Sequence, residues 1–231
     1  MIPFDVVGVG PGSRDYLLPA ALEAIENADL LVGSPRLLDI FSYLGKDVFP
    51  YRSNLSALLD YIGEQQKQRK IALLVSGDPG YHSLLGAVSR SFPEESYSVI
   101  PGISSFQAAM ARRKKPWQGD LLLSCHGKDF SEISAGVRGA LETGRRVILL
   151  TDHRWNPGTV AAELLKELQE PKELQPAKGK EERPGEHRVW LAEDMTMAGE
   201  SFTETNLGKL AAGAWHPEEE KEYRLCVMII E

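Results

Sequence analysis

The stretch LLVSGDPG at residues 73–80 decides the fold class. Its apolar residues continue a run that begins at Ile71, and the run ends abruptly in a turn with two glycines, a proline and a carboxylate. This pattern predicts a buried strand that brings Asp78 to its carboxyl end. In open α/β sheets small ligands bind at that end, where an aspartate can accept hydrogen bonds from a ribose or an amine. A purely local Gly-Asp-Pro-Gly turn explains the same residues, so this stretch alone leaves both interpretations open.

Two other stretches follow the same plan. FDVVGVGPG at residues 4–12 and VIPGISS at residues 99–105 each read as a strand that ends in a turn with glycine and proline. The second turn leads into a predicted helix whose first hydroxyl groups can cap exposed backbone donors. Glycine allows the backbone to approach a ligand closely, and proline fixes the turn. We therefore expect the three strand ends to converge on one binding site.

Apolar strands alternate with helical patterns along the chain, which indicates βα units and mainly parallel pairing. The last strands are expected to add some antiparallel pairing, and residues 171–187, with almost no apolar side chain, are expected to form a mobile surface loop. The predicted strands cover residues 4–9, 29–32, 47–50, 71–76, 99–101, 121–124, 147–151, 188–192 and 223–230. The predicted helices cover residues 19–27, a segment opening at 34–35, and residues 54–68, 81–92, 104–112, 131–142 and 159–168.

The run RRKKPW at residues 112–117 places four cations directly before a proline. Cations suit the negative end of a helix dipole, and Pro116 prevents the helix from continuing. We interpret this run as the crossover between two α/β lobes, residues 1–113 and 117–231.

Composition excludes several classes of protein. The chain has 231 residues and a net charge of −7, which disfavours a nonspecific nucleic-acid surface. Its amino terminus has no basic region followed by a long apolar run, so we expect no signal peptide, no membrane span and a cytoplasmic location.

The two cysteines, Cys125 and Cys226, lie far apart in sequence and have no metal-ligand partners nearby. We expect reduced thiols in the core and no metal site. Cys125 precedes His126, but neighbouring side chains in a strand point to opposite faces, which disfavours a nucleophile with its base.

The turns GVGPG at residues 8–12, SGDPG at 76–80 and PGISS at 101–105, in this order and spacing, resemble those of the tetrapyrrole methylases of cobalamin and sirohaem synthesis. The first turn is not a dinucleotide or phosphate loop, because the third glycine of that fingerprint falls on Ser13 or Arg14 and no P-loop lysine follows. The resemblance covers nearly the whole chain, and its specific motifs lie in the first two thirds.

Within the family, three pieces most resemble the branch that methylates carbon 5 of cobalt-precorrin-7: LVSGDPGYHSLL at 74–85, PGISSFQ at 101–107 and SCHGK at 124–128. The resemblance implies a two-lobed α/β fold with S-adenosylmethionine held between the lobes, S-adenosylhomocysteine as product, and usually a homodimer. Residues 1–113 would form the tetrapyrrole side and part of the donor site, and residues 117–231 the rest. The length implies methylation of carbon 5 only, with a separate partner for C15-methylation and decarboxylation.

Position by position, the resemblance also implies site residues. The donor contacts are Pro11, Ser76, Gly77, Asp78, Ser104, Ser105 and Thr151. Gly12, Tyr81 and His82 are assigned to the tetrapyrrole side. A sulfonium methyl group is already a strong electrophile, so the protein has mainly to align two reactants and exclude water. His126 is the best candidate for a general base because its glycine-flanked turn should lie at a strand's carboxyl end, and Asp152, His153 or water are the alternatives. The cations at 112–115 could instead contact substrate carboxylates.

Three classes of function stay open. The first is methylation of carbon 5 of cobalt-precorrin-7. The second is a sibling methylase that acts on another ring carbon, with diphthine synthase and the 16S ribosomal RNA ribose methylase as more distant relatives. A noncatalytic binding module is the third class. Loss of donor affinity on changing Asp78 would separate the enzymes from such a module, provided that the module does not itself bind the donor.

Overall fold

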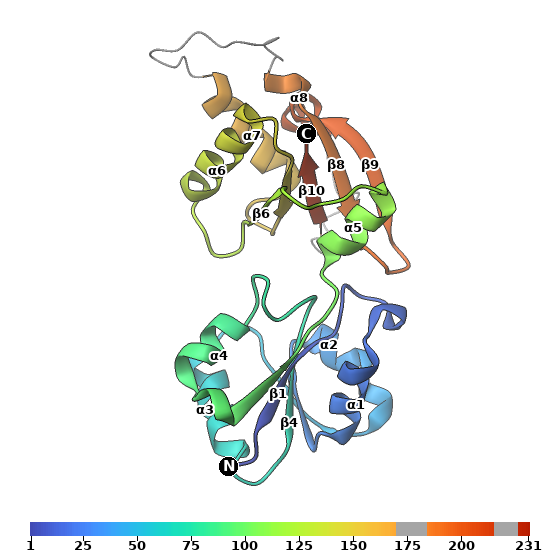
Figure 1. Cartoon of the computed structure of the whole chain (residues 1–231), viewed down its shortest axis with the longest axis vertical. Coiled ribbons are helices and arrows are strands. Elements are labelled where there is room, and N and C mark those ends of the chain that lie inside the picture. The colour runs from blue at the N-terminus through green and yellow to red at the C-terminus, as the bar shows by residue number, and fades with distance from the viewer. Residues whose placement is uncertain (170–183, 215–225) are drawn as a thin grey trace. The chain divides into compact units, whose positions relative to one another are not determined.

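The computed structural model describes residues 1–169, 184–214 and 226–231. The chain divides into two units, Met1–Ala108 and Ala109–Glu231, each with its own five-stranded sheet (Figure 1). The division falls within helix α5 (Ser105–Arg113), ahead of the crossover predicted at residues 112–117. The start of α5 packs with the first unit, since the ring of Phe106 contacts Tyr81, and its end packs with the second, since Arg113 pairs with Glu231.

The sheet of the first unit has the strand order β3-β2-β4-β1-β5, and all four of its strand pairs are parallel, as predicted. Its strands are β1 (Phe4–Gly8), β2 (Leu30–Gly33), β3 (Asp47–Pro50), β4 (Ile71–Val75) and β5 (Tyr97–Ile100). Because β4, β1 and β5 are neighbours in a parallel sheet, the turns that follow them lie at one edge.

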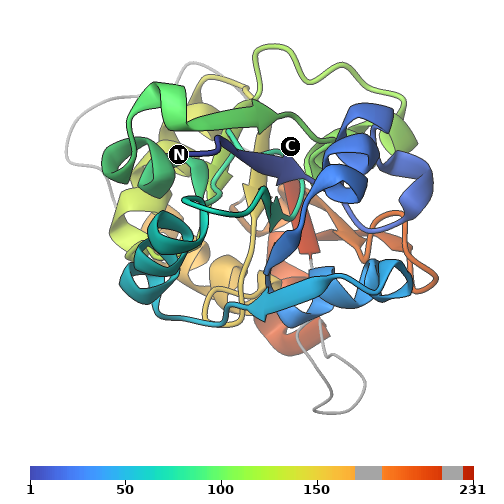
Figure 2. The same cartoon turned by 90° about the horizontal axis from the view of Figure 1, so that it is seen from below.

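Helices cover both faces of this sheet (Figure 1; Figure 2). They are α1 (Pro19–Asn27), α2 (Pro35–Ile40), α3 (Leu55–Gln65) and α4 (Leu85–Ser91), with short 3₁₀ turns at Arg14–Tyr16, Ser42–Leu44 and Glu94–Ser96. Alternate strand residues separate two cores. Val7 and Leu74 face α1 and α2, whereas Val6 and Leu73 face α3 and α4.

The helix predicted at residues 81–92 begins only at Leu85, so that prediction was wrong for its first turn. His82 has a backbone φ of 50°, in the left-handed region, which a right-handed helix does not accommodate. Tyr81 meets the ring of Phe106 edge-on, with centroids 5.1 Å apart. The turn after β4 is therefore longer than its sequence pattern indicates.

The sheet of the second unit has the order β6-β7-β10-β8-β9. Its strands are β6 (Leu121–Ser124), β7 (Val147–Leu150), β8 (Arg188–Glu193), β9 (Ser201–Asn206) and β10 (Cys226–Ile230). β6 and β7 are parallel, whereas the pairs β7–β10, β10–β8 and β8–β9 are antiparallel, so antiparallel pairing is more extensive than expected. The sequence analysis missed β9, whose sequence SFTETN is polar, and residues 223–225 of the last predicted strand lie outside the described residues.

Helices α6 (Phe130–Glu142) and α7 (Pro157–Gln169) pack on one face of this sheet, and a short turn of helix, α8 (Leu207–Lys209), leads into a π-turn at Leu210–Ala214. The other face carries Trp190, whose ring lies 4.1 Å from the guanidinium of Arg113. Of the predicted loop 171–187, residues 171–183 lie outside the described part of the chain, and Pro184–Glu186 forms a 3₁₀ turn.

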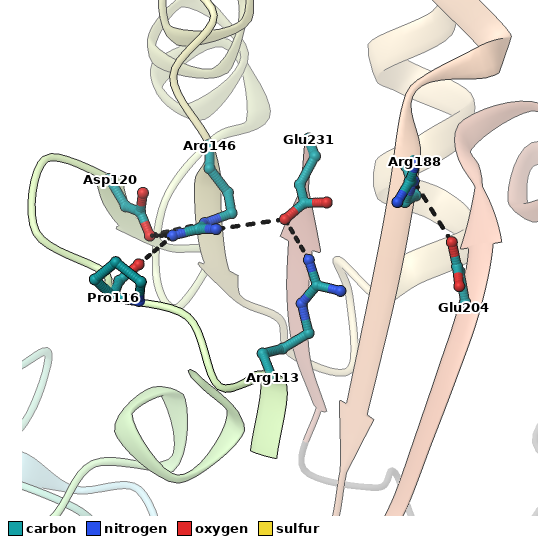
Figure 3. A network of polar contacts seen from close by, with 7 residues as sticks. All are labelled: Arg113, Pro116, Asp120, Arg146, Arg188, Glu204 and Glu231. Carbon is teal, nitrogen blue, oxygen red and sulfur yellow. Dashed lines mark hydrogen bonds and ion pairs between the residues drawn. The ribbon is translucent and has the colours of Figure 1, made fainter. Parts of the chain in front are cut away.

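A network of ion pairs joins the segment after α5 to the sheet of the second unit (Figure 3). Arg146 donates through Nε to Asp120 over 2.9 Å and approaches Glu231 at 3.4 Å, while Arg113 donates to the same carboxylate of Glu231. The side chains of Arg146 and Asp120 are only 17% and 9% exposed. Arg112 also has an acidic partner, since its Nε donates to Glu200 over 2.7 Å. Two cations of the run at residues 112–115 are thus engaged within the chain.

We predict that Arg146→Gln lowers the free energy of unfolding by about 3 kcal/mol, because it leaves the buried carboxylate of Asp120 without its cation and removes one of the two arginines that pair with Glu231. Arg188→Gln is the matched control: its pair with Glu204 spans 3.5 Å and both side chains are about half exposed, so its loss should cost less than about 1 kcal/mol (Figure 3). Urea unfolding monitored by circular dichroism measures both. Equal losses would contradict the role given to the network.

Candidate functional site

The turns after β1 and β4 are joined by backbone hydrogen bonds. The N–H of Gly77 donates to the carbonyl of Gly10 over 2.8 Å, and the N–H of Gly10 donates back to Gly77 over 3.4 Å. Both residues have positive φ, 78° for Gly10 and 68° for Gly77, which glycine adopts at little cost. This pair of bonds fixes the two turns relative to each other.

The end of β5 joins the same cluster through a close approach of three backbones. A Cβ atom on Gly102 would lie 2.1 Å from the carbonyl oxygen of Gly77, and one on Gly8 would lie 2.7 Å from the nitrogen of Gly102. Side chains at these positions cannot be accommodated without moving main chain. The three strand ends that the sequence predicted to converge therefore meet at their backbones.

Asp78 links two of these turns through its carboxylate. Oδ1 accepts from the N–H of Gly80 over 2.8 Å, and Oδ2 accepts from the N–H of Gly102 over 3.1 Å. The first bond shapes the turn after β4, and the second ties it to the turn after β5. Each oxygen keeps a further lone pair, so this positioning role is compatible with the predicted contact to a ligand.

Ser104 and Ser105 lie at the start of α5, directly after the β5 turn. Ser104 is buried, and its N–H donates to Oε1 of Gln107 over 2.8 Å. Sequence reasoning missed this role of Gln107, although a serine followed three residues later by glutamine is the sequence pattern of a capping box, of which this bond is one half. Gln107 thus holds the backbone of Ser104 in place at the strand edge.

The other predicted residues of the first unit lie in the same loops. Pro11 is buried and Gly12 half-buried after β1, whereas Ser76 is exposed directly after β4. Burial raises the pKa of Tyr81 above its usual value, and the neighbouring His82 is exposed. Together with Gly77, Asp78, Ser104 and Ser105, these residues form the candidate donor and substrate site of this unit.

Sequence reasoning also missed Arg36, the second residue of α2. Its Nη2 donates to Oγ of Ser76 over 3.4 Å. An isolated arginine in the pattern SPRLL carries no motif, and only the packing of β2 beside β4 brings it to the turn after β4.

The two predicted residues of the second unit, Thr151 and His126, follow the parallel strands β7 and β6, so both lie at one edge of that sheet. Thr151 is buried, and its hydroxyl donates to the carbonyl of Cys226 over 2.9 Å. His126 is exposed, with Nδ1 2.9 Å from Oγ of Ser124. A proton shared between these two atoms would set which tautomer His126 adopts.

The alternative base Asp152 has a structural partner. Its Oδ1 accepts from the N–H of Trp155 over 2.7 Å, and the indole Nε1 of Trp155 donates to the carbonyl of Lys128 over 3.2 Å. Trp155 therefore joins the loops that follow β6 and β7, and Asp152 fixes the turn that presents it.

Cys125 is fully buried. Burial, with a smaller effect from the negative charge of Asp152, raises the pKa of its thiol to about 12. A thiol that stays protonated over the physiological range is a poor nucleophile, which agrees with the expectation from sequence.

We predict that Gly102→Ala destabilises the protein by at least about 3 kcal/mol, because its Cβ would collide with backbone. Gly63→Ala in α3 is the control, since its Cβ would make an ordinary 3.7 Å contact with Phe92 and alanine favours a helix by up to about 1 kcal/mol. Chemical denaturation measures both variants. A Gly102→Ala protein as stable as the wild type would contradict the close approach of the three turns.

We predict that Cys125 resists iodoacetamide at mildly alkaline pH in the folded protein and reacts once urea unfolds it, because the pKa of the unfolded thiol returns toward 9.0. Peptide mass spectrometry of the labelled chain measures this. Cys125→Ala should also retain the activity of the wild type, and a loss of activity in a stably folded variant would reinstate the thiol as a functional group.

The sequence model of the Tetrapyrrole (Corrin/Porphyrin) Methylases matches residues 4–211, which includes the three glycine turns, His126 and Thr151. The chain belongs to this family. Most of both units falls within the match.

Named relatives support the same family. The chain is 30% identical over 211 residues to a probable cobalt-precorrin-7 C(5)-methyltransferase of Methanocaldococcus jannaschii, covering 90% of this chain and 91% of the relative. It is 35% identical over 160 residues to the cobalt-precorrin-7 C(5)-methyltransferase of Salmonella typhimurium, covering 69% of this chain and 76% of the relative.

Solved structures share the fold. A precorrin-6Y methylase (cbiE) of Archaeoglobus fulgidus superposes with a TM-score of 0.65 at 24% identity, over 100% of this chain and 97% of that chain. A uroporphyrin-III C-methyltransferase of Thermus thermophilus, complexed with S-adenosylhomocysteine, gives a TM-score of 0.74 at 15% identity, over 99% and 96% of the two chains. The two-lobed tetrapyrrole methylase fold expected from sequence is confirmed.

Further features of the described ranges bear on the site. They contain no group of three His, Cys, Asp or Glu residues able to hold a metal ion, and no helix in them is both long and apolar enough to span a membrane. A hollow of about 630 Å³ lies beside α3, lined by residues such as Leu59 and Phe92 and by none of the predicted site residues.

Proposed function

We propose that this tetrapyrrole methylase transfers a methyl group from S-adenosylmethionine to carbon 5 of cobalt-precorrin-7 in cobalamin biosynthesis. The observation that carries the proposal is the identity of 30–35% to two proteins with that printed activity, one of them matched over 90% of this chain. The joined strand-end turns of the first unit supply the place where such a donor would be held.

The residues of the first unit fit the donor. Gly8, Gly77 and Gly102 carry no side chains, so their turns lie against one another and a nucleoside or an amino acid held at this edge would meet main chain. Asp78 keeps acceptor capacity for an amine or ribose hydroxyl beyond the two bonds it already accepts. Pro11, Ser104 and Ser105 flank these groups, and Thr151 of the second unit stays a prediction as a further donor contact.

The bound donor supplies an electrophilic methyl group, so catalysis consists mainly of alignment. The S–CH₃ bond breaks as the new C–C bond forms, and S-adenosylhomocysteine leaves. Asp78 and the glycine turns hold the loops rigid, which keeps the reactants in line and limits the entropy lost in reaching the transition state. The proton balance requires a base or solvent, and His126 is our candidate because it is exposed at a strand end.

Gly12, Tyr81 and His82 are proposed to face the tetrapyrrole. The positive φ of His82 is an uncommon conformation for a residue with a side chain, and such strain concentrates at functional sites. We further propose a cytoplasmic homodimer that works beside a separate C15-methyltransferase and decarboxylase.

A second candidate, methylation of a different ring carbon, is favoured by one observation. The chain is 32% identical over 120 residues to a cobalt-precorrin-4 C(11)-methyltransferase of Methanocaldococcus jannaschii, although this match covers only 47% of the chain. The longer matches to the C(5) enzymes favour carbon 5.

Incubation of the purified protein with cobalt-precorrin-7 and a ¹³C-methyl-labelled donor tests the proposal. We expect one new methyl signal, assigned to carbon 5 by NMR. A label at another carbon would refute the regiochemistry and retain the family, and absence of any transfer by a protein that binds the donor's product would favour a binding module.

We predict that Asp78→Asn weakens binding of S-adenosylhomocysteine about tenfold or more, because the amide NH₂ faces a backbone N–H where the carboxylate accepted a hydrogen bond. Titration calorimetry measures the affinity. Asp60→Asn, an exposed change on α3, should leave it unaltered. Unchanged affinity in Asp78→Asn would remove this residue from the donor site.

A further inference from the structure

The side-chain amide of Gln107 is held at the start of α5 by a single hydrogen bond. Its Oε1 accepts from the N–H of Ser104 over 2.8 Å. A backbone N–H can only donate, so the amide atom that faces it is the oxygen. Oxygen and nitrogen belong to the same planar group, and this bond therefore fixes the orientation of the NH₂ group as well.

The NH₂ group of Gln107 keeps its capacity to donate. Among the residues that the structure describes, no acceptor pairs with its nitrogen, and the side chain is half-buried rather than enclosed in the core. A ligand that covers such a group takes away its bonds to water, which costs free energy unless the ligand supplies an acceptor. A molecule bound here is therefore expected to present a lone pair to Gln107.

The amide lies beside the turns of the candidate site. A Cβ on Gly77 would lie 3.5 Å from Cα of Ser104 and 3.9 Å from its Oγ, so the residue that holds Gln107 packs against the turn after β4. The next residue of that turn, Asp78, accepts from the N–H of Gly102. Neighbouring turns thus supply an acceptor, the carboxylate of Asp78, and a donor, the NH₂ group of Gln107.

We propose that the NH₂ group of Gln107 donates a hydrogen bond to an acceptor atom of the bound methyl donor, either a carboxylate oxygen of its methionine part or a ring nitrogen of its adenine. This inference rests on the proposed function. A carboxylate such as that of Asp78 offers lone pairs only and cannot bind these atoms. Because Ser104 holds the amide before the ligand arrives, little side-chain entropy is lost on binding.

Gln107→Glu separates the contact with the ligand from the contact with Ser104. A glutamate oxygen still accepts from the N–H of Ser104, as in a capping box, but an oxygen replaces the NH₂ group. Gln107→Met removes both functions at similar side-chain length. Gln68→Glu is the matched control for the added charge, since Gln68 is exposed and precedes β4, at the end of that strand remote from Asp78.

We expect Gln107→Glu to unfold at the same urea concentration as the wild type and to raise the Kd for S-adenosylhomocysteine about tenfold or more, because a hydrogen bond is replaced by two facing lone pairs. Gln107→Met should lower the urea midpoint and also raise the Kd. Gln68→Glu should match the wild type in both measurements. Circular dichroism and titration calorimetry supply the two values.

A second ligand, 5′-methylthioadenosine, locates the acceptor atom, because it has the adenine of the donor and lacks the amino acid. If Gln107→Glu raises its Kd as much as that of S-adenosylhomocysteine, the contact is to adenine. If its Kd stays at the wild-type value while that of S-adenosylhomocysteine rises, the contact is to the carboxylate. Both results support the inference.

Two results would overturn it. Wild-type affinity for S-adenosylhomocysteine in Gln107→Glu would leave Gln107 as a helix cap alone. A urea midpoint as low in Gln107→Glu as in Gln107→Met would show that Ser104 does not hold this side chain through its oxygen. Neither result touches the proposed function, whose failure appears in the wild type, as absence of a carbon-5 product.

Discussion

The carboxylate of Asp78 and the glycines around it are the constraint on which the rest of the first unit depends. One side chain accepts from two turns, and three glycines remove every Cβ that would separate those turns. A parallel sheet by itself brings strand ends only to the spacing of its hydrogen bonds. The additional contacts between Gly8, Gly77 and Gly102 turn this edge into one rigid backbone surface, and rigidity is what an alignment mechanism requires.

The sequence predicted the parallel sheet, most helix positions and the convergence of three turns, because each depends on local signals. Apolar runs that end in glycine and proline are read directly from the chain. Arg36 and Gln107 escaped prediction as site-supporting residues for different reasons. The contact of Arg36 with Ser76 exists only through the pairing of β2 with β4, whereas Gln107 carried a capping signal that went unused. The extra turn at Tyr81 and His82 was missed because apolar spacing does not report a left-handed residue.

In the second unit, ion pairs rather than close contacts between glycines fix the position of the main chain. Arg146 holds Asp120 and Glu231, and Arg113 shares the latter, so the segment that leaves α5 is attached to two strands by side chains. On the sheet edge of this unit, Trp155 joins the loops after β6 and β7 in a comparable way. The run of cations at residues 112–115, read as a solvated helix end or as a substrate contact, has in part this internal role.

The polar strand β9 has a consequence for the behaviour of the molecule in concentrated solution. Among the described residues it is an outer strand of the second sheet, where main-chain groups without a partner strand invite another chain to add one. Its threonines and Glu204 make such an addition unfavourable, since a charge would be desolvated at the new junction. The polar sequence of β9, which gives no hydrophobic pattern from which to predict a strand, therefore also protects the protein against addition of strands from other molecules.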